Sequence, residues 1–232
     1  MEEIIEGLEE FSKKIGVKFK NTDLLVNAFV HRSYLNENHQ IKMESNERLE
    51  FLGDAVLELV VTEYLFAGYQ KPEGELTAIR SALVRGKHLS EIADEIGLFA
   101  YILLSQGEKN GSEKSKSLIM ANAFEALVGA IYLDQGYDVV KKFILDNVVS
   151  NTQEIINSKL YVDAKSEFQE KVQEKFKFTP HYKVLEESGP DHNKKFVSGV
   201  FIDKDLVSRG EGSSKNLAEQ DAARIALEKV FS

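Results

Sequence analysis

The segment that most constrains the fold is a helix whose apolar residues cover almost its whole circumference. It runs from Asn46 to Phe66 and reads NERLEFLGDAVLELVVTEYLF. A helix that is apolar all round is normally buried or packed between two bodies. The same helix carries carboxylates at spacings of three, four and four residues, which places them on one face: Glu47, Glu50, Asp54 and Glu58. Crowded like charges repel one another and lose hydration, so a divalent cation would stabilise them.

A second apolar helix is predicted over residues 118–134, LIMANAFEALVGAIYLD, with Asn122 and Glu125 on one face. If the two helices cross, Glu50 and Asp54 converge with Asn122 and Glu125. All four donate oxygen, which favours Mg²⁺ or Mn²⁺ over Zn²⁺ or Cu²⁺. An acidic stripe is also typical of an ordinary solvated helix face, so that alternative stays open. A di-iron bundle would need Glu-x-x-His pairs, and this helix has none.

Composition excludes several classes of protein. The 232 residues include no cysteine, so disulfides, thiolate zinc sites and cysteine nucleophiles are excluded. The first residues, MEEIIEGLEEF, are too acidic for a signal peptide. No uncharged apolar stretch reaches the roughly 20 residues that span a bilayer, so we expect a cytoplasmic protein without membrane association. The net charge of −9 resides mostly in the first 160 residues, and the remainder is nearly balanced.

The pattern predicts two domains: an all-α domain over residues 1–157 and a small α+β domain over 163–232. In the first, residues 105–117 read as a polar, mobile segment and 72–74 as a turn. The helices expected there cover residues 3–15, 22–31, 46–66, 75–84, 87–96, 118–134 and 139–159. In the second domain the expected order is helix, three strands, helix: 164–176, 181–185, 195–202, 205–210 and 216–230.

The segment NERLEFLGD (Asn46–Asp54) is similar to the signature of bacterial ribonuclease III. Its surroundings agree in order: HRSYLNEN, PEG, LVRGKHL and AFEALVGAIYLDQGY. The segments FQEKVQ, GPDHNKKF and GEGSSKNLAEQDAA resemble a double-stranded-RNA-binding domain. The resemblance covers nearly the whole chain. It implies a homodimeric endoribonuclease that hydrolyses double-stranded RNA with Mg²⁺, leaves 5′-phosphate and 3′-hydroxyl ends, and processes ribosomal and messenger RNA precursors.

The resemblance also implies roles for individual acidic residues. Glu50, Asp54 and Glu125 fall on the family's metal-binding carboxylates, and Asp54 and Glu125 are the catalytic pair. Glu47 and Glu73 fall on further acidic positions of the cleft. Asn122 stands where the family most often has Asp, so it keeps an oxygen donor and loses the charge. We interpret it as a weaker metal ligand; the alternative is a noncatalytic double-stranded-RNA-binding protein whose metal site Asn122 impairs.

Two neighbouring residues have structural interpretations as well. Phe51 lies off the carboxylate stripe and corresponds to an aromatic knob at the family's dimer interface; the alternative is a core aromatic residue. His31 reads as a hydrogen-bonded structural histidine rather than a catalyst.

The second domain offers RNA contacts at three separated places. Double-stranded RNA is recognised mainly through its shape, 2′-hydroxyls and phosphates. The candidates are Gln169 and Gln173 on the first helix, His192 and Lys194 in a loop, and Ser214 and Lys215 at the start of the last helix. A Gln pair is also typical of a solvated face, and a loop histidine is often incidental. Asn216 replaces a lysine of the family, so we expect more salt-sensitive binding.

Overall fold

The computed structural model describes residues 2–150, 152–157, 164–190 and 194–231. They divide into two units, Met1–Tyr161 and Val162–Ser232, which are described separately. The first unit is helical, and its elements follow in chain order: α1 (Glu2–Lys14), α2 (Thr22–Ala28), α3 (Arg32–Glu37), α4 (Glu47–Gly68), α5 (Glu73–Val84), α6 (Gly86–Glu95), the 3₁₀ turn η1 (Leu98–Tyr101), α7 (Gln106–Lys109), α8 (Glu113–Gln135), α9 (Tyr137–Asn147) and α10 (Thr152–Asn157).

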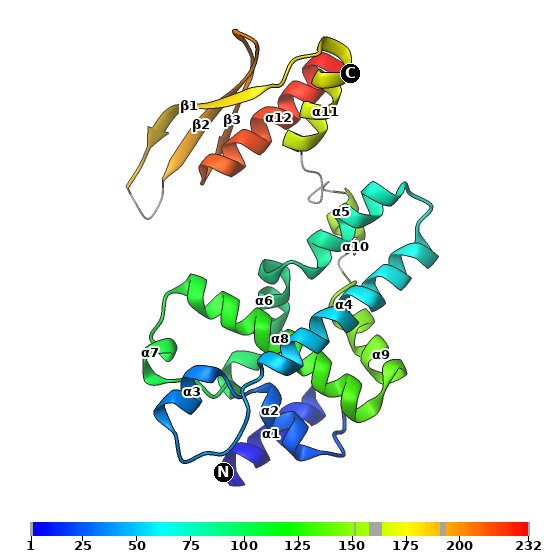
Figure 1. The fold of residues 1–232 in the computed structure, drawn as a ribbon, viewed down its shortest axis with the longest axis vertical. Coiled ribbons are helices and arrows are strands. Elements are labelled where there is room, and N and C mark those ends of the chain that lie inside the picture. Colours follow the sequence, from blue (N-terminus) through cyan, green and yellow to red (C-terminus); the bar gives the residue numbers. More distant parts are fainter. Residues whose placement is uncertain (1, 151, 158–163, 191–193, 232) are drawn as a thin grey trace. The chain divides into compact units, whose positions relative to one another are not determined.

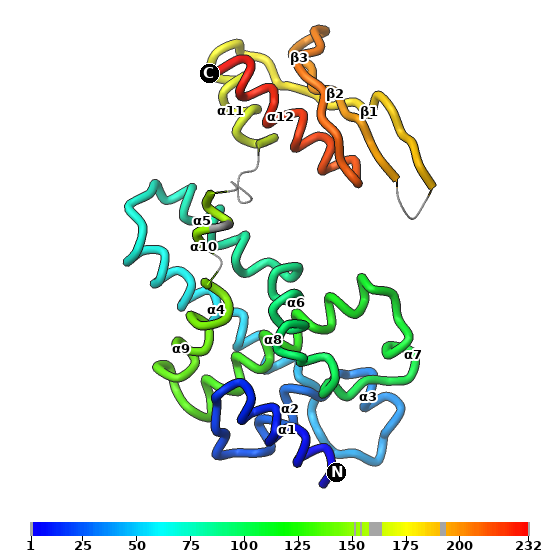
Figure 2. The backbone as a smooth tube through the Cα atoms, turned by 180° about the vertical axis from the view of Figure 1, so that it is seen from behind, coloured from blue at the N-terminus to red at the C-terminus, as the bar shows by residue number. Residues whose placement is uncertain are grey.

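The core of the first unit is built around α8. Figure 1 and, from behind, Figure 2 show this helix passing through the middle of the unit with other helices around it. Its buried residues include Phe124, Leu127 and Ile131, and α4 contributes Leu57 and Val60 to the same core. Among the described residues, α8 alone is long and apolar enough to cross a membrane by length and composition. However, 56% of its apolar window is buried inside the unit, as in a core helix.

Four expected elements of this unit were wrong. The helix expected through residue 31 ends at Ala28, and a separate short helix, α3, follows because His31 caps it. The expected turn at 72–74 is the start of α5. Residues 105–117 are largely helical because Ser105 caps α7 and Ser112 caps α8. In place of the helix expected over 139–159, the structure has α9, which ends at Asn147, and α10, which ends at Asn157; residues 158 and 159 lie outside the described residues.

The second unit has the predicted order of elements. Helix α11 (Ala164–Phe176) precedes an antiparallel sheet of β1 (His181–Ser188), β2 (Lys195–Ile202) and β3 (Asp205–Gly212), and α12 (Lys215–Phe231) follows. The two helices pack on one face of the sheet around a small core of alanine and apolar residues, in which Phe168, Val200 and Ala222 are fully buried.

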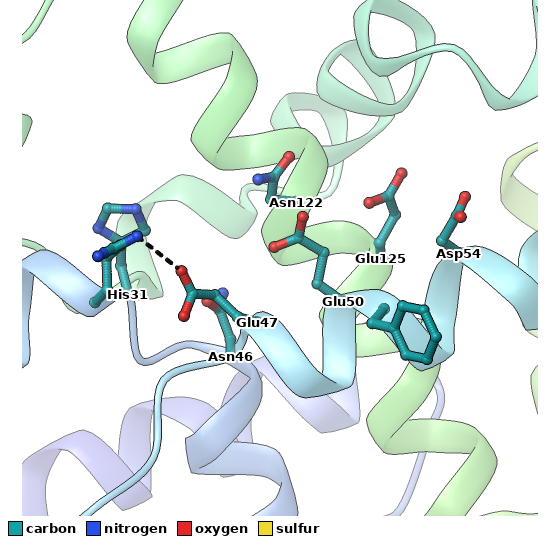
Figure 3. A pocket seen from close by; sticks show the side chains of 9 residues that line it. His31, Asn46, Glu47, Glu50, Asp54, Asn122 and Glu125 are labelled. Atoms are coloured by element: carbon teal, nitrogen blue, oxygen red, sulfur yellow. Dashed lines mark hydrogen bonds and ion pairs between the residues drawn. The ribbon is translucent and has the colours of Figure 1, made fainter.

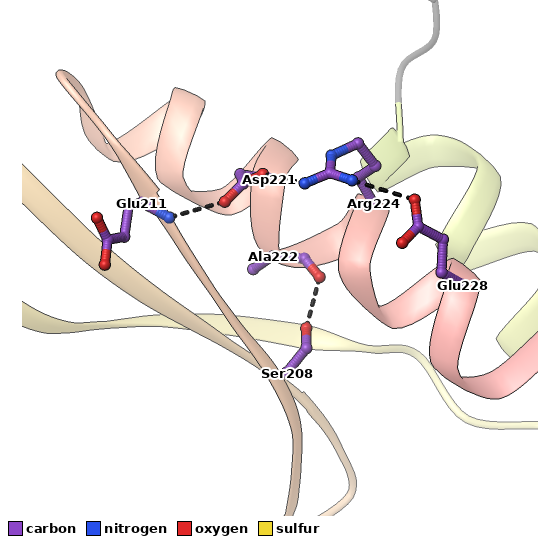
Figure 4. Close-up of polar contacts among 6 residues, drawn as sticks. All are labelled: Ser208, Glu211, Asp221, Ala222, Arg224 and Glu228. Carbon is purple, nitrogen blue, oxygen red and sulfur yellow. Dashed lines mark hydrogen bonds and ion pairs between the residues drawn. The ribbon is translucent and has the colours of Figure 1, made fainter.

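Polar contacts attach α12 to β3 (Figure 4). The Ser208 hydroxyl donates to the carbonyl of Ala222 at 2.5 Å, and the Glu211 N–H donates to Asp221 at 3.0 Å. Arg224 then bridges Asp221 and Glu228 along the helix at 2.8 and 3.1 Å. The contacts from Ser208 and Glu211 hold the middle of α12 against β3.

Candidate active site and RNA-binding surface

Two glycines allow α4 and α8 to cross in backbone contact. A Cβ atom built on Gly53 would lie 1.7 Å from the carbonyl oxygen of Glu125, and one built on Gly129 would lie 2.3 Å from that of Leu49. Both distances are far below van der Waals contact, so only glycine fits at either position. Because Glu50 and Asp54 flank Gly53, and Glu125 lies at the crossing, the close approach brings their side chains to one place.

A pocket of about 550 Å³ lies at this crossing. Nine described residues line it: His31, Arg32, Asn46, Glu47, Glu50, Phe51, Asp54, Asn122 and Glu125. Figure 3 shows the end groups of Asn122, Glu50, Glu125 and Asp54 directed toward the same side of the two helices. The structure thus gathers the four expected ligands and Glu47 around one pocket. Glu73 does not line it; this residue begins α5, where its carboxylate accepts a hydrogen bond from Thr77 at 3.5 Å.

Two carboxyl groups of the pocket, those of Glu50 and Glu125, have raised pKa values. Burial, followed by the charges of Asp54 and Glu50, raises the pKa of Glu125 to about 7. Burial also raises the pKa of Glu50, with the charges of Glu47 and Asp54 adding to the effect and a hydrogen bond from Asn122 opposing it. A bound cation would relieve this repulsion.

The donor set suits a hard divalent cation. Carboxylate and amide oxygens are the ligands that Mg²⁺ and Mn²⁺ prefer. In the described part of the chain, no three His, Cys, Asp or Glu side chains form a ready-made metal site. Side-chain rotation would therefore have to bring the carboxylates closer together around an ion.

The rim of the pocket contains two residues that the sequence did not single out for function, Arg32 and Asn46. Arg32 forms an ion pair with Glu47 at 3.2 Å, and the Ser45 hydroxyl donates to the other oxygen of Glu47 at 2.9 Å. Asn46 is buried and donates to the carbonyl of Ala28 at 3.2 Å, so it anchors the start of α4. The sequence signal that could have identified them is that each adjoins a residue already considered for the site: Arg32 follows His31, and Asn46 precedes Glu47.

His31 has the structural role expected for it. Its Nδ1 accepts the backbone N–H of Ser33 at 3.2 Å and caps α3. Burial lowers the pKa of His31, while the charges of Glu108 and Glu47 oppose that shift. The ring is therefore neutral at pH 7 and positions the chain beside the pocket.

Phe51 is not a core aromatic residue of this chain. Its side chain is 82% exposed at the edge of the pocket. Leu59 and Phe66 are also exposed along α4, at 52% and 82%. Their spacing from Phe51, eight and fifteen residues, places them on the same side of the helix. An exposed apolar stripe of this kind is typical of a protein–protein contact surface.

In the second unit, the described RNA-contact candidates lie at separate places on the surface. Gln169 and Gln173 are exposed on α11, where Gln173 donates to Thr179 at 3.3 Å. Lys194 pairs with Glu187 at 2.7 Å just before β2. Ser214 accepts the N–H of Leu217 at 3.3 Å and Lys215 begins α12. His192 lies outside the described residues.

Comparison with known proteins identifies both units. A family model described as ribonuclease-III-like matches residues 21–152, and the double-stranded RNA binding motif matches residues 164–230. Ribonuclease 3 of Leptospira interrogans is 45% identical, over 98% of this chain and 92% of its own. Ribonuclease 3 of Enterococcus faecalis is 40% identical, over 95% and 96%.

A solved structure agrees with the helical fold of the first unit. The nuclease domain of ribonuclease III from Campylobacter jejuni, described for flexibility in a region involved in dimer formation, matches with a TM-score of 0.56 and 40% identity. The match covers 62% of this chain and 97% of that one. Taken with the crossing of α4 and α8 and with the α-β-β-β-α unit that follows in the sequence, these similarities show that the chain belongs to the ribonuclease III family, the metal-dependent endoribonucleases specific for double-stranded RNA.

Proposed function

We propose that the pocket at the α4–α8 crossing is the catalytic site and that it binds Mg²⁺, with Mn²⁺ able to replace it. The ligands are Glu50, Asp54 and Glu125, together with the side-chain oxygen of Asn122. The observation that carries this assignment is that residues from two distant segments line one pocket, where the charges of Asp54 and Glu50 help raise the pKa of Glu125.

The reaction is hydrolysis of a phosphodiester in duplex RNA. The oxygen of water bonds to phosphorus, the bond to the ribose 3′ oxygen breaks, and that oxygen takes up a proton, leaving 5′-phosphate and 3′-hydroxyl ends. When bound, Mg²⁺ would supply the acidity that activates water and the charge that stabilises the scissile phosphate. Asp54 and Glu125 must both be ionised to serve as ligands. Glu47 adds negative charge at the rim of the pocket.

Compared with Asp, Asn122 weakens this site but keeps one oxygen donor. Its amide oxygen is a suitable ligand, while its NH₂ group is not and its charge is zero. We propose an active enzyme with reduced metal affinity. The neutral amide also supports a second candidate, a protein that binds duplex RNA without cutting it.

The apolar stripe of Phe51, Leu59 and Phe66 supports a homodimer formed through α4. In such a dimer Phe51 would enter a pocket of the other subunit, and two related sites would each cut one strand and leave short 3′ overhangs. Glu73, which lies outside this pocket, would then line the acidic valley of the dimer rather than bind the metal.

The second domain, proposed to span residues 163–232 after a nuclease domain at 1–157, holds the duplex. We propose contacts from Gln169 and Gln173, from His192 and Lys194, and from Ser214 and Lys215. The natural substrates would be duplex regions of ribosomal and messenger RNA precursors in the cytoplasm.

A cleavage assay separates the two candidate functions. The full chain is incubated with a perfect RNA duplex in Mg²⁺ and, separately, in Mn²⁺, and strand scission is followed alongside binding. We expect scission in both metals, with the Asn122→Asp variant cleaving about 10-fold faster at limiting metal because it adds a charged ligand. Asn110→Asp, which adds the same charge outside the pocket, should change nothing. Binding without scission in either metal would favour the noncatalytic protein.

A further inference from the structure

One wall of the carboxylate pocket carries a positive charge. Among the nine described residues that line it, only Arg32 has a side chain that is charged positively at every working pH. His31 beside it has a pKa lowered by burial and is neutral at pH 7. The other charged side chains of the lining are the carboxylates of Glu47, Glu50, Asp54 and Glu125.

The positive charge of Arg32 would reduce the repulsion between the carboxylates of the pocket and an approaching RNA strand. Any phosphodiester that approaches brings negative charge toward four carboxylates. A bound metal ion would offset the negative charge of the reacting phosphate. The neighbouring phosphates of the strand would still meet the acidic rim of the pocket at Glu47. A guanidinium is the side chain best suited there, because its planar fork matches two phosphate oxygens.

The structure holds Arg32 ready for such a contact. Its backbone is fixed, since the His31 N–H donates to the carbonyl of Leu103 at 3.2 Å and His31 caps the helix that Arg32 begins. Its side chain is 69% exposed, and a single N–H, from Nη1, donates to Glu47. Five donors are available on a guanidinium, so a second acceptor fits without breaking this contact.

The ion pair with Glu47 does little for stability. Both partners are exposed, 69% and 53%, and exposed pairs contribute little because water screens them. Glu47 itself is held twice, by Arg32 and by the Ser45 hydroxyl at 2.9 Å. The fold therefore does not depend on this ion pair, and a second acceptor can join Arg32 at the rim of the pocket while Glu47 stays in place.

We propose that Arg32 contacts a backbone phosphate of the duplex next to the scissile one, and so positions the strand over the carboxylate pocket. The proposal rests on the proposed function. It assigns to the nuclease unit a phosphate contact of its own, separate from those of the second domain.

The test compares two arginines of the same kind. Arg48 pairs with Glu44 at 3.1 Å, is 84% exposed and does not line the pocket, so it is a matched control for Arg32. Arg32→Ala, Arg32→Lys and Arg48→Ala are made in the full chain. Steady-state cleavage of a perfect duplex in Mg²⁺ is measured at several salt concentrations. Binding of the same duplex is measured in a Glu125→Ala background, where no cleavage intervenes.

For Arg32→Ala we expect KM to rise about 5-fold while kcat changes less than about 2-fold. The salt dependence of log affinity should lose about 1 unit of slope. Arg32→Lys should recover part of the affinity, and Arg48→Ala should match the wild type. The proposal is overturned if Arg32→Ala equals Arg48→Ala in KM, affinity and salt slope while the wild type cleaves. A wild-type protein that does not cleave would instead contradict the proposed function.

Discussion

The two units of this chain distribute charge in opposite ways. In the nuclease unit, four carboxylates line one pocket and two of them have raised pKa values. In the RNA-binding unit, charged side chains lie in separate ion pairs over the surface, as for Lys194 with Glu187 and Lys165 with Glu219. Carboxylates gathered around one pocket suit a single ligand, and each of them is needed to hold it. Dispersed ion pairs suit a surface on which each contact with the duplex adds its own small share to the affinity.

The largest effect should come from the concentrated region. Glu125→Ala removes a proposed metal ligand at the α4–α8 crossing, so cleavage should fall by on the order of 10³-fold or more. Duplex binding should stay within about 2-fold, because the second unit is untouched. Glu113→Ala is the control, since Glu113 lies on the same helix with a 96% exposed side chain. Parallel loss of cleavage and binding would show that the two units do not divide the work.

A deletion tests the dispersed region as a whole. Removing residues 163–232 leaves a unit with its own core, and the nuclease domain of the Campylobacter relative was solved alone. Duplex affinity should fall by about 100-fold at physiological salt and less at low salt. Electrophoretic mobility shifts at two salt concentrations measure this. Unchanged affinity would place the main RNA contacts in the nuclease unit and erase the contrast.

The charge crowding should be visible in stability as well. A carboxyl whose pKa is raised on folding, here from 4.5 to about 7, stabilises the fold only while protonated, so that contribution is lost as the pH rises through this range. In EDTA at pH 7.5, Glu125→Gln should be more stable than the wild type by about 1–2 kcal/mol, allowing for partial solvent exposure. At pH 4.5 the difference should largely vanish.

Urea unfolding at the two pH values measures that difference. Mn²⁺ should then stabilise the wild type more than Glu125→Gln, which lacks a charged ligand. An equal gain in both proteins would mean that the ion binds elsewhere.

The smallest effect belongs to single contacts of the second unit. Lys215→Ala should weaken duplex binding about 3-fold and reduce the salt slope by about 1, since one phosphate contact is lost. Lys204, in the exposed turn between β2 and β3, offers a control lysine whose replacement should have no effect. Fluorescence anisotropy resolves changes of this size. A loss from Lys215→Ala as large as that from the deletion would mean that this surface also depends on one residue.

Much of this fold was predictable from sequence because its signals are local. Apolar coverage identified α4 and α8, and the strand pattern identified β1 to β3 with their order. The failures occurred where a polar side chain decides a boundary. Serine caps turn residues 105–117 into helix, and a histidine cap, which is not a usual helix signal, starts α3.

The oxygen-bearing residues that gather at the candidate site were predictable, and their surroundings were not. Glu50, Asp54, Asn122 and Glu125 were recognisable by residue type and spacing. The place of Arg32 depends on how the chain before α4 folds back beside it, through contacts such as the Asn46 N–H with the Val30 carbonyl at 2.8 Å. Such long-range contacts leave no periodic pattern in the sequence, so the place of Arg32 in the pocket wall could be learned only from the structure.

Gly53 and Gly129 have no functional group, yet they set the distance between α4 and α8 at the candidate site. One added methyl group at either position would push the two helices apart and separate the carboxylates of α4 from Glu125 on α8. A mutational screen that scores only loss of cleavage would therefore rank these two glycines alongside the carboxylate residues of the pocket. Chemical inspection of the side chains alone would overlook them, because what they contribute is an absence of volume.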